Sequence, residues 1–183
     1  MPFTFTKLAI SDVVLIEPKK FGDDRGFFTE LFKESDFTFA GQIRQINFSK
    51  SSQGVLRGLH YQLAPYSQSK IVRAVSGKIF DVAVDLRKGS KTFGKWVGEV
   101  LDSDKMNMLY VPEGFAHGFE VLSESAEIEY FCNREYAPQH ERGIKYDDPD
   151  INIKWNNSKL NISEKDAKFP YLKSAQINFS KVD

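Results

Sequence analysis

Residues 78–86 read Lys-Ile-Phe-Asp-Val-Ala-Val-Asp-Leu, and this stretch decides the fold. Its even-numbered positions from Phe80 to Leu86 are all apolar, while the odd-numbered positions include Asp81 and Asp85. Successive side chains of an extended chain point to opposite faces, so this alternation predicts a β-strand with one apolar face. Glycines at 77 and 89 bound it as turn residues. Two aspartates on the other face predict that this face is either exposed to solvent or functional.

The same alternation recurs in short segments separated by Gly, Pro, Asn or Asp, which is typical of an all-β sandwich or barrel. Further strands are expected at 42–48, 58–62, 70–75, 96–101, 108–111, 118–122 and 127–132. Short helices are expected only at 30–36 and after Ser163, and the polar tail from Asn156 is expected to be a peripheral flap. The sequence therefore predicts one all-β domain over residues 1–183. A small closed barrel can hold one small ligand inside.

Composition excludes several classes of partner. The 25 Lys and Arg balance the 25 Asp and Glu, so no net field attracts nucleic acid or an acidic membrane. No run approaches the ~18 apolar residues of a membrane-spanning helix, and Met1–Lys7 lacks the layout of a secretory signal. The single cysteine, Cys132, excludes an internal disulfide and a cysteine-rich zinc site. We therefore expect a cytoplasmic protein.

Two histidines beside glycines are the first candidates for chemistry. Residues 55–62 place Arg57 and His60 around Gly58, and alone His60 is more readily a core residue than a base. Pro112 and Gly114 form a turn that delivers His117 to the next strand, which makes one shared site the better interpretation. Arg57 and His60 would point to opposite faces of a regular strand. Either Gly58 marks a bulge, or Arg57 precedes the strand.

Two further groups have both a structural and a chemical interpretation. Tyr130 shares a face with Ile128 and Cys132, where it either packs its ring or, near a histidine, serves as a proton donor. Ser163 is a good helix N-cap, and the sequence alone favours a helix start as the role of the segment from Ser163 to Asp166. Alternatively, Asp166 orients a histidine and stabilises its charged form.

Eight blocks in order along the chain resemble one family, the dTDP-4-dehydrorhamnose 3,5-epimerases of the cupin superfamily. The blocks are Asp24-Arg-Gly-Phe-Phe-Thr-Glu30, Gln45-Ile-Asn47, Val55-Leu-Arg-Gly-Leu-His-Tyr-Gln62, Lys70-Ile-Val-Arg73, Phe80-Asp-Val-Ala-Val-Asp-Leu-Arg-Lys-Gly-Ser90, Pro112-Glu-Gly-Phe-Ala-His-Gly-Phe119, Ala137-Pro-Gln-His-Glu-Arg-Gly143 and Ser163-Glu-Lys-Asp166. They cover nearly the whole chain, so together they are far more specific than any one block.

The resemblance implies a fold, a reaction and a set of site residues. The fold is a cupin-type double-stranded β-helix, or jelly-roll barrel, with a few short peripheral helices, usually a homodimer through exchanged edge strands. The reaction inverts carbons 3 and 5 of a nucleotide-linked 4-keto-6-deoxyhexose, dTDP-4-dehydro-6-deoxy-D-glucose giving dTDP-4-dehydro-L-rhamnose, without metal or cofactor. The implied catalytic residues are the base His60 with its partner Asp166, the acid Tyr130, and Lys70 and His117 near the keto oxygen and ring. Asp81 is the implied partner of His117. The implied substrate contacts are Arg25, Phe28, Glu30, Gln45, Asn47, Arg57, Tyr136, Glu141 and Lys165.

Departures from the family pattern leave alternatives open. Phe131, Arg134 and Glu135 are unusual beside Tyr136, and this is the edge where a different base or sugar would be recognised. One alternative is an epimerase acting at carbon 3 or carbon 5 alone, or a sugar-nucleotide binder without activity. Another is a metal-dependent cupin that uses His60, His117 and a carboxylate, although Gln62 stands where such proteins usually carry a second histidine.

Overall fold

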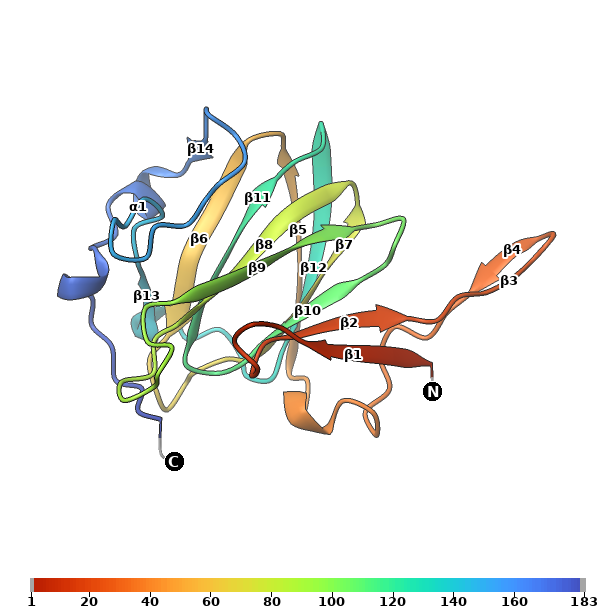
Figure 1. The fold of residues 1–183 in the computed structure, drawn as a ribbon, viewed down its shortest axis with the longest axis horizontal. Coiled ribbons are helices and arrows are strands. Elements are labelled where there is room, and N and C mark those ends of the chain that lie inside the picture. Colours follow the sequence, from red (N-terminus) through yellow and green to blue (C-terminus); the bar gives the residue numbers. More distant parts are fainter. Residues whose placement is uncertain (1, 182–183) are drawn as a thin grey trace.

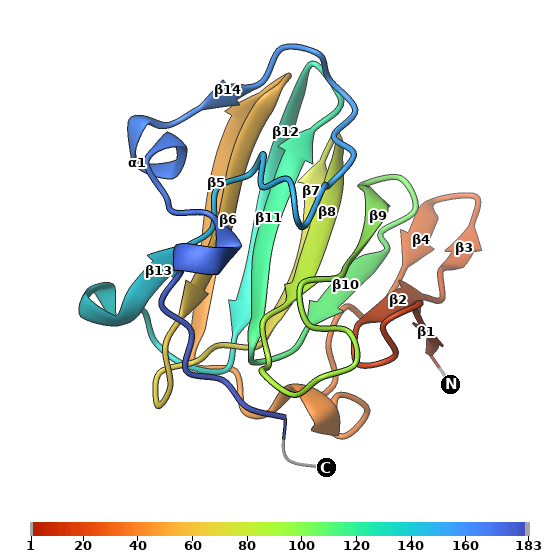
Figure 2. The same ribbon diagram turned by 60° about the vertical axis from the view of Figure 1, so that its left-hand side comes forward.

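Two curved antiparallel sheets face each other across the core in a computed structural model that describes residues 2–181 (Figures 1 and 2). The strands are β1 (Phe3–Lys7), β2 (Val14–Pro18), β3 (Phe21–Asp23), β4 (Gly26–Phe28), β5 (Gln45–Ser52), β6 (Val55–Gln62), β7 (Lys70–Ser76), β8 (Lys78–Asp85), β9 (Trp96–Asp102), β10 (Met108–Val111), β11 (Phe115–Val121), β12 (Ser125–Cys132), β13 (Glu141–Gly143) and β14 (Asn161–Ile162). The first sheet has the order β1-β2-β10-β7-β12-β5. The second has the order β13-β6-β11-β8-β9, with β14 added parallel to β6. The all-β prediction is confirmed, and every predicted strand is found with shifted ends at most.

One predicted helix is wrong and one is confirmed. Residues 30–36 form an irregular segment that ends in a turn, and a single 3₁₀ turn follows at Thr38–Ala40. The rings of Phe32 and Phe37 pack 5.0 Å apart and join the β1 aromatics, so burial of these rings outweighs helix propensity. The predicted C-terminal helix is the short α1 (Glu164–Ala167), and no helix in residues 2–181 is long and apolar enough to cross a membrane.

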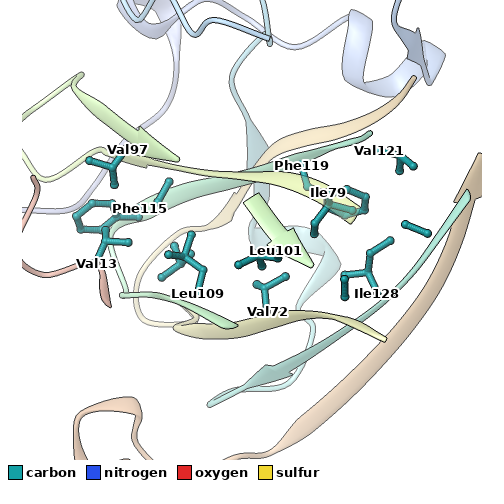
Figure 3. Packing of buried hydrophobic residues seen from close by; sticks show 14 of the residues in the cluster. Val13, Val72, Ile79, Val97, Leu101, Leu109, Phe115, Phe119, Val121 and Ile128 are labelled. Carbon is teal, nitrogen blue, oxygen red and sulfur yellow. The ribbon is translucent and has the colours of Figure 1, made fainter. Parts of the chain in front are cut away.

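Strand β8 is buried on both faces, which corrects the expectation of a wet side. Its Ile79 and Ala83 enter the main core between the sheets (Figure 3). Its Val82 and Val84 pack outward beneath the C-terminal segment, which crosses this sheet and buries Phe179 there. Asp81 and Asp85 are fully buried, so each carboxylate needs a partner inside the protein.

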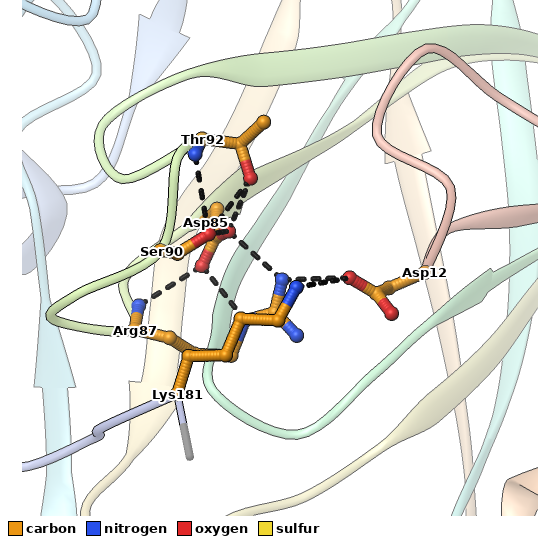
Figure 4. A network of polar contacts seen from close by, with 6 residues as sticks. All are labelled: Asp12, Asp85, Arg87, Ser90, Thr92 and Lys181. Atoms are coloured by element: carbon orange, nitrogen blue, oxygen red, sulfur yellow. Dashed lines mark hydrogen bonds and ion pairs between the residues drawn. The ribbon is translucent and has the colours of Figure 1, made fainter. Parts of the chain in front are cut away.

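Asp85 finds its partners in one polar network at the end of β8 (Figure 4). Its carboxylate accepts hydrogen bonds from the Arg87 guanidinium and from the hydroxyls of Ser90 and Thr92. Burial acts to raise the pKa of Asp85, but these bonds outweigh burial and lower it to about 2. Arg87 also pairs with Asp12 at 2.8 Å, so the network joins the β1–β2 loop to the barrel.

A β-bulge resolves the difficulty between Arg57 and His60. Opposite β6, His117 pairs with His60 while Phe119 pairs with Arg57, so β6 carries one extra residue between them. Gly58 lies in this bulge with φ of +133°, and a Cβ there would approach Gly118 to 2.6 Å. The first of the two expected explanations is confirmed: the bulge turns Arg57 relative to His60.

Candidate active site

A cavity of about 270 Å³ lies between the two sheets at the β6–β13 edge of the barrel. The first sheet contributes side chains from β5, β7 and β12, and the second contributes side chains from β6 and β13. The residues that line it are Gln45, Asn47, His60, Tyr61, Gln62, Gln68, Lys70, Tyr130, Tyr136 and Glu141. Seven of these were predicted as site residues from the sequence, although they come from segments up to 96 residues apart, from 45 to 141.

His60 is held by a carboxylate from the distant C-terminal segment. Its Nε2 lies 2.9 Å from Asp166 Oδ1, and the Gly58 backbone N–H donates to Asp166 Oδ2 at 3.2 Å. Burial acts to raise the pKa of Asp166, but the His60 hydrogen bond and charge outweigh burial and lower it. Since Nε2 points to Asp166, Nδ1 is the ring nitrogen left to exchange a proton in the cavity.

Asp166 also keeps the simpler structural role that the sequence favoured. Its backbone N–H donates to Ser163 Oγ at 3.0 Å, which caps α1. The cap fixes the start of a one-turn helix, and the Asp166 side chain then projects from that turn toward β6. The segment therefore starts a helix and also places the Asp166 carboxylate against His60, so the two interpretations are compatible.

A second histidine–carboxylate pair lies deeper in the barrel. His117 Nε2 is 2.7 Å from Asp81 Oδ1, with both side chains almost fully buried. Burial lowers the pKa of His117 despite Asp81, and the charges of Lys70 and His60 lower it further, so this ring is neutral at pH 7. Asp81 Oδ2 is buried and has no hydrogen-bond partner in residues 2–181.

Lys70 and Tyr130 stand on neighbouring strands of the opposite sheet. Lys70 Nζ lies 6.0 Å from the centre of the Tyr130 ring. Burial lowers the pKa of Lys70, while Cys132, Asp81 and Glu141 act to raise it. Burial also raises the pKa of Tyr130, and the charge of Arg57 opposes that rise. Tyr130 therefore keeps its phenolic proton at neutral pH.

Glu141 joins two other predicted residues at the rim of the cavity. It accepts hydrogen bonds at 2.6 Å from both the Tyr136 hydroxyl and Lys165 Nζ. Gln45 Oε1 accepts from the Tyr136 backbone N–H at 2.7 Å. Burial acts to raise the pKa of Glu141, but Lys165 and Tyr136 outweigh burial and lower it, so Glu141 is an anion at the rim. The half-exposed Tyr136 ring is free to contact a ligand.

Five predicted substrate contacts do not line this cavity. Lys165 bonds the rim residue Glu141 from outside the lining, Arg57 is an exposed residue of β6, and the other three lie farther away. Arg25, Phe28 and Glu30 belong to the β3–β4 hairpin and the segment that follows it, and the hairpin projects from the far side of the barrel (Figure 1). Phe28 is 65% exposed, and Arg25 pairs only with its neighbour Asp23 in the described chain. Within one copy of the chain, the structure does not bring them to His60.

Sequence reasoning missed three lining residues, and one of them carried a signal. Gln62 alternates with His60 on β6, so both side chains share the cavity face. Gln62 Oε1 accepts from the Ala137 N–H, and Gln62 Nε2 donates to Tyr66 O, which fixes the loop that carries Tyr136. Gln68 lies in a loop and Tyr61 faces the core on the other side of β6, so no alternation pointed to either.

The arrangement can transfer protons on two sides of one ligand. A histidine oriented by a carboxylate stands on one sheet, and a protonated phenol beside a buried lysine stands on the other. These are the groups that acid–base chemistry next to a carbonyl needs. In residues 2–181 no group of three or more His, Cys, Asp or Glu side chains is placed to hold a metal ion.

Comparisons with known proteins agree on one family. A family model described as dTDP-4-dehydrorhamnose 3,5-epimerase matches residues 7–174. A relative of that name from Shigella flexneri is 53% identical over 164 residues, which span 87% of this chain and 91% of the relative.

Two crystal structures of similar proteins extend this agreement to the fold. A dTDP-6-deoxy-D-glucose-3,5-epimerase from Legionella pneumophila, in complex with dTDP-4-keto-L-rhamnose, is 42% identical with a TM-score of 0.89 over 94% of each chain. A dTDP-4-dehydrorhamnose 3,5-epimerase from Sulfolobus tokodaii is 46% identical with a TM-score of 0.90, over 97% of this chain and 99% of that one.

Proposed function

The chain belongs to the dTDP-4-dehydrorhamnose 3,5-epimerase family, and from that premise we propose how its cavity performs the reaction. It is an isomerase with the cupin jelly-roll fold that inverts carbons 3 and 5 of dTDP-4-dehydro-6-deoxy-D-glucose to give dTDP-4-dehydro-L-rhamnose. One observation carries the mechanism: His60, which Asp166 holds from behind, and Tyr130 line the same cavity from opposite sheets. We treat residues 1–183 as a single cupin-like domain that works in the cytoplasm, since its one cysteine suits a reducing compartment.

His60 is the general base. The ketone at carbon 4 acidifies the hydrogens on carbons 3 and 5, so a well-placed imidazole can remove either one. Asp166 orients the ring and stabilises the imidazolium that forms when Nδ1 takes the proton. Removal of the proton leaves an enolate with its charge on the oxygen at carbon 4.

Lys70 stabilises that enolate, and Tyr130 completes the inversion. A buried cation close to the developing oxyanion contributes about 2.7–4 kcal/mol, as a preorganised oxyanion-hole donor does. Tyr130 returns a proton from the face opposite to His60, so the configuration at carbon 3 or 5 inverts. The neutral His117, held by Asp81, adds a hydrogen bond near the ring.

The rim residues bind the nucleotide. The Tyr136 ring stacks beside the base, while Glu141 and Lys165 offer an acceptor and a donor to its polar edge. Gln45 and Asn47 line the sugar end of the cavity. Arg57, whose Nε donates to Ser51 Oγ at 3.1 Å, is positioned to meet the diphosphate.

A second copy of the chain supplies the remaining contacts. The β3–β4 hairpin exposes Phe21, Phe27 and Phe28 to 49%, 56% and 65%, and isolated soluble chains rarely expose such clusters. In a two-fold homodimer, each hairpin would reach the cavity of the other copy and deliver Arg25, Phe28 and Glu30 to its nucleotide. The rings would be buried in the same step.

Proton NMR of dTDP-4-dehydro-6-deoxy-D-glucose in deuterated water tests the chemistry. We expect the wild-type chain to exchange the hydrogens at carbons 3 and 5, and His60→Asn to exchange neither. Tyr130→Phe should still exchange hydrogen while forming little inverted product. Exchange at only one carbon would make the protein a single-centre epimerase, and exchange by His60→Asn would remove His60 as the base.

Co-expression of one variant with weakened substrate binding and one inactive variant tests the dimer. Arg25→Ala should raise KM about tenfold or more, because a hydrogen bond to a charged group contributes about 1.5–3 kcal/mol. When Arg25→Ala and His60→Asn chains are paired, one cavity has an intact His60 and an intact hairpin from its partner. Activity at low substrate should therefore recover. No recovery in a verified heterodimer would mean that Arg25 acts only within its own chain.

A further inference from the structure

Gly143 leaves an open position beside the proposed base. Strand β13 pairs with β6 so that Gly143 lies directly opposite His60, and Glu141 lies opposite Gln62. Paired residues in antiparallel strands point to the same face, so the missing side chain of Gly143 opens a notch next to the His60 ring. A Cβ on Gly143 would lie only 2.3–2.5 Å from three ring atoms of Phe169. The Phe169 ring therefore fills this notch.

Phe169 contacts His60 from the notch. The two rings are 5.6 Å apart between centres and inclined at 78°, the edge-to-face arrangement that aromatic pairs favour. Phe169 is only three residues after Asp166, and its backbone N–H donates to Asp166 O at 3.3 Å. One short turn thus presents both a carboxylate and an aromatic ring to the same imidazole.

The turn is itself anchored next to β13. The Lys145 backbone N–H donates to Pro170 O at 2.9 Å, so the residue after Phe169 is tied to the chain that leaves Gly143. The carboxylate alone fixes one nitrogen of His60 but leaves the ring free to rotate about that hydrogen bond. A second contact nearly perpendicular to the ring removes this rotation, so the imidazole keeps one orientation beside the cavity that it lines.

We infer that Phe169, seated on Gly143, is a positioning residue that holds the His60 ring in its productive orientation. This inference rests on the proposed role of His60 as the base. The ring of Phe169 touches the base and not the reacting carbons, so its loss should slow proton transfer without weakening nucleotide binding.

Steady-state kinetics and histidine NMR test the inference on the full chain. Phe169→Ala should lower kcat about tenfold, the effect of misaligning a catalytic group by a fraction of an ångström, with KM changed less than twofold. Phe169→Leu, which refills the notch without an aromatic ring, should restore most of kcat. Phe93→Ala removes a phenylalanine that is 36% exposed in the loop before β9, and serves as the control with unchanged kcat.

The chain has three histidines, so the His60 ring signal can be assigned by its loss in His60→Asn. We expect Phe169→Ala to move that signal alone and to leave those of His117 and His140 in place. Gly143→Ala must displace the Phe169 ring and should lower kcat by a similar factor. In the Phe169→Ala background, Gly143→Ala should then have little further effect on kcat, because the clash is gone.

Two results would overturn the inference. The first is a folded Phe169→Ala protein with wild-type kcat, and the second is a loss of kcat in which all three histidine signals move together, which indicates a general structural effect. Both results bear on Phe169 only when His60→Asn has lost its exchange activity. If His60→Asn keeps its exchange activity, the proposed base is wrong, and that failure is separate from any result at Phe169.

Discussion

Replacing Asp166 by Asn probes the link between the structure and the chemistry most directly. Both carboxylate oxygens accept hydrogen bonds, one from His60 Nε2 at 2.9 Å and one from the Gly58 N–H at 3.2 Å. An asparagine offers one acceptor and one donor. The Gly58 N–H is fixed in the backbone, so the amide oxygen must face it and the amide nitrogen must face His60.

His60 then has to accept at Nε2 and carry its proton on Nδ1, the nitrogen that residue 166 does not hold. The variant loses a charge-assisted hydrogen bond of about 1.5–3 kcal/mol, and the preferred tautomer of its ring is wrong for a base. At 1.36 kcal/mol per tenfold, a loss of about 2 kcal/mol alone slows exchange about 30-fold. We expect a decrease of at least that size in kcat, with KM within threefold of wild type.

Single-turnover exchange in deuterated water, followed at carbons 3 and 5, measures this decrease. Glu164→Gln is the matched control, because it removes a carboxylate that is 94% exposed in the same turn and should leave exchange unchanged. A folded Asp166→Asn protein with the wild-type exchange rate would refute the reasoning. The pKa of Asp166 lies below its ordinary 3.8, so the pair also stabilises the fold above that pH and loses this contribution as the pH falls further.

Three other variants test separate parts of the molecule. Lys70→Met should lower kcat about 100-fold or more in steady-state assays, and a loss confined to KM would contradict its role at the enolate. Asp85→Asn should lower the unfolding free energy at pH 7 by about 2 kcal/mol or more, since the pKa of Asp85 is lowered to about 2. In denaturant titrations the difference from wild type should shrink as the pH falls from about 4 through 2. A difference that does not change with pH would contradict this role of Asp85. Gly118→Ala places a Cβ 2.8 Å from Arg57 O, so it should lower both the melting temperature and kcat. If neither changes, β6 and β11 can move apart at this point without cost.

The fold could be predicted from local pattern because alternation is a local property. Residues 78–86 showed which side chains share a face, and β8 has those faces. Alternation does not show whether a polar face meets water, and Asp81 and Asp85 proved to be fully buried. The predicted helix at 30–36 failed because the local pattern does not show that Phe32 packs against Phe37 and the aromatic rings of β1.

The candidate site was predictable in composition but not in arrangement. The segments made His60 and Tyr130 candidates, the family resemblance gave them roles, and the structure brings both to one cavity. No local signal linked His60 to Asp166, because their contact depends on the C-terminal segment returning across the barrel. The fit of Phe169 onto Gly143 also needs two distant segments to meet. The family resemblance supplied most of the groups, and the long-range packing decided which of them touch.

The separation of His60 from Asp166 by 106 residues has a consequence for the life of the chain. On the ribosome, β6 and all strands through β13 are synthesised before the turn that carries Asp166. A nascent chain can therefore pair the strands of its barrel while His60 still lacks the carboxylate. The His60–Asp166 pair is completed only near the end of synthesis, when the segment after β13 folds back onto the second sheet.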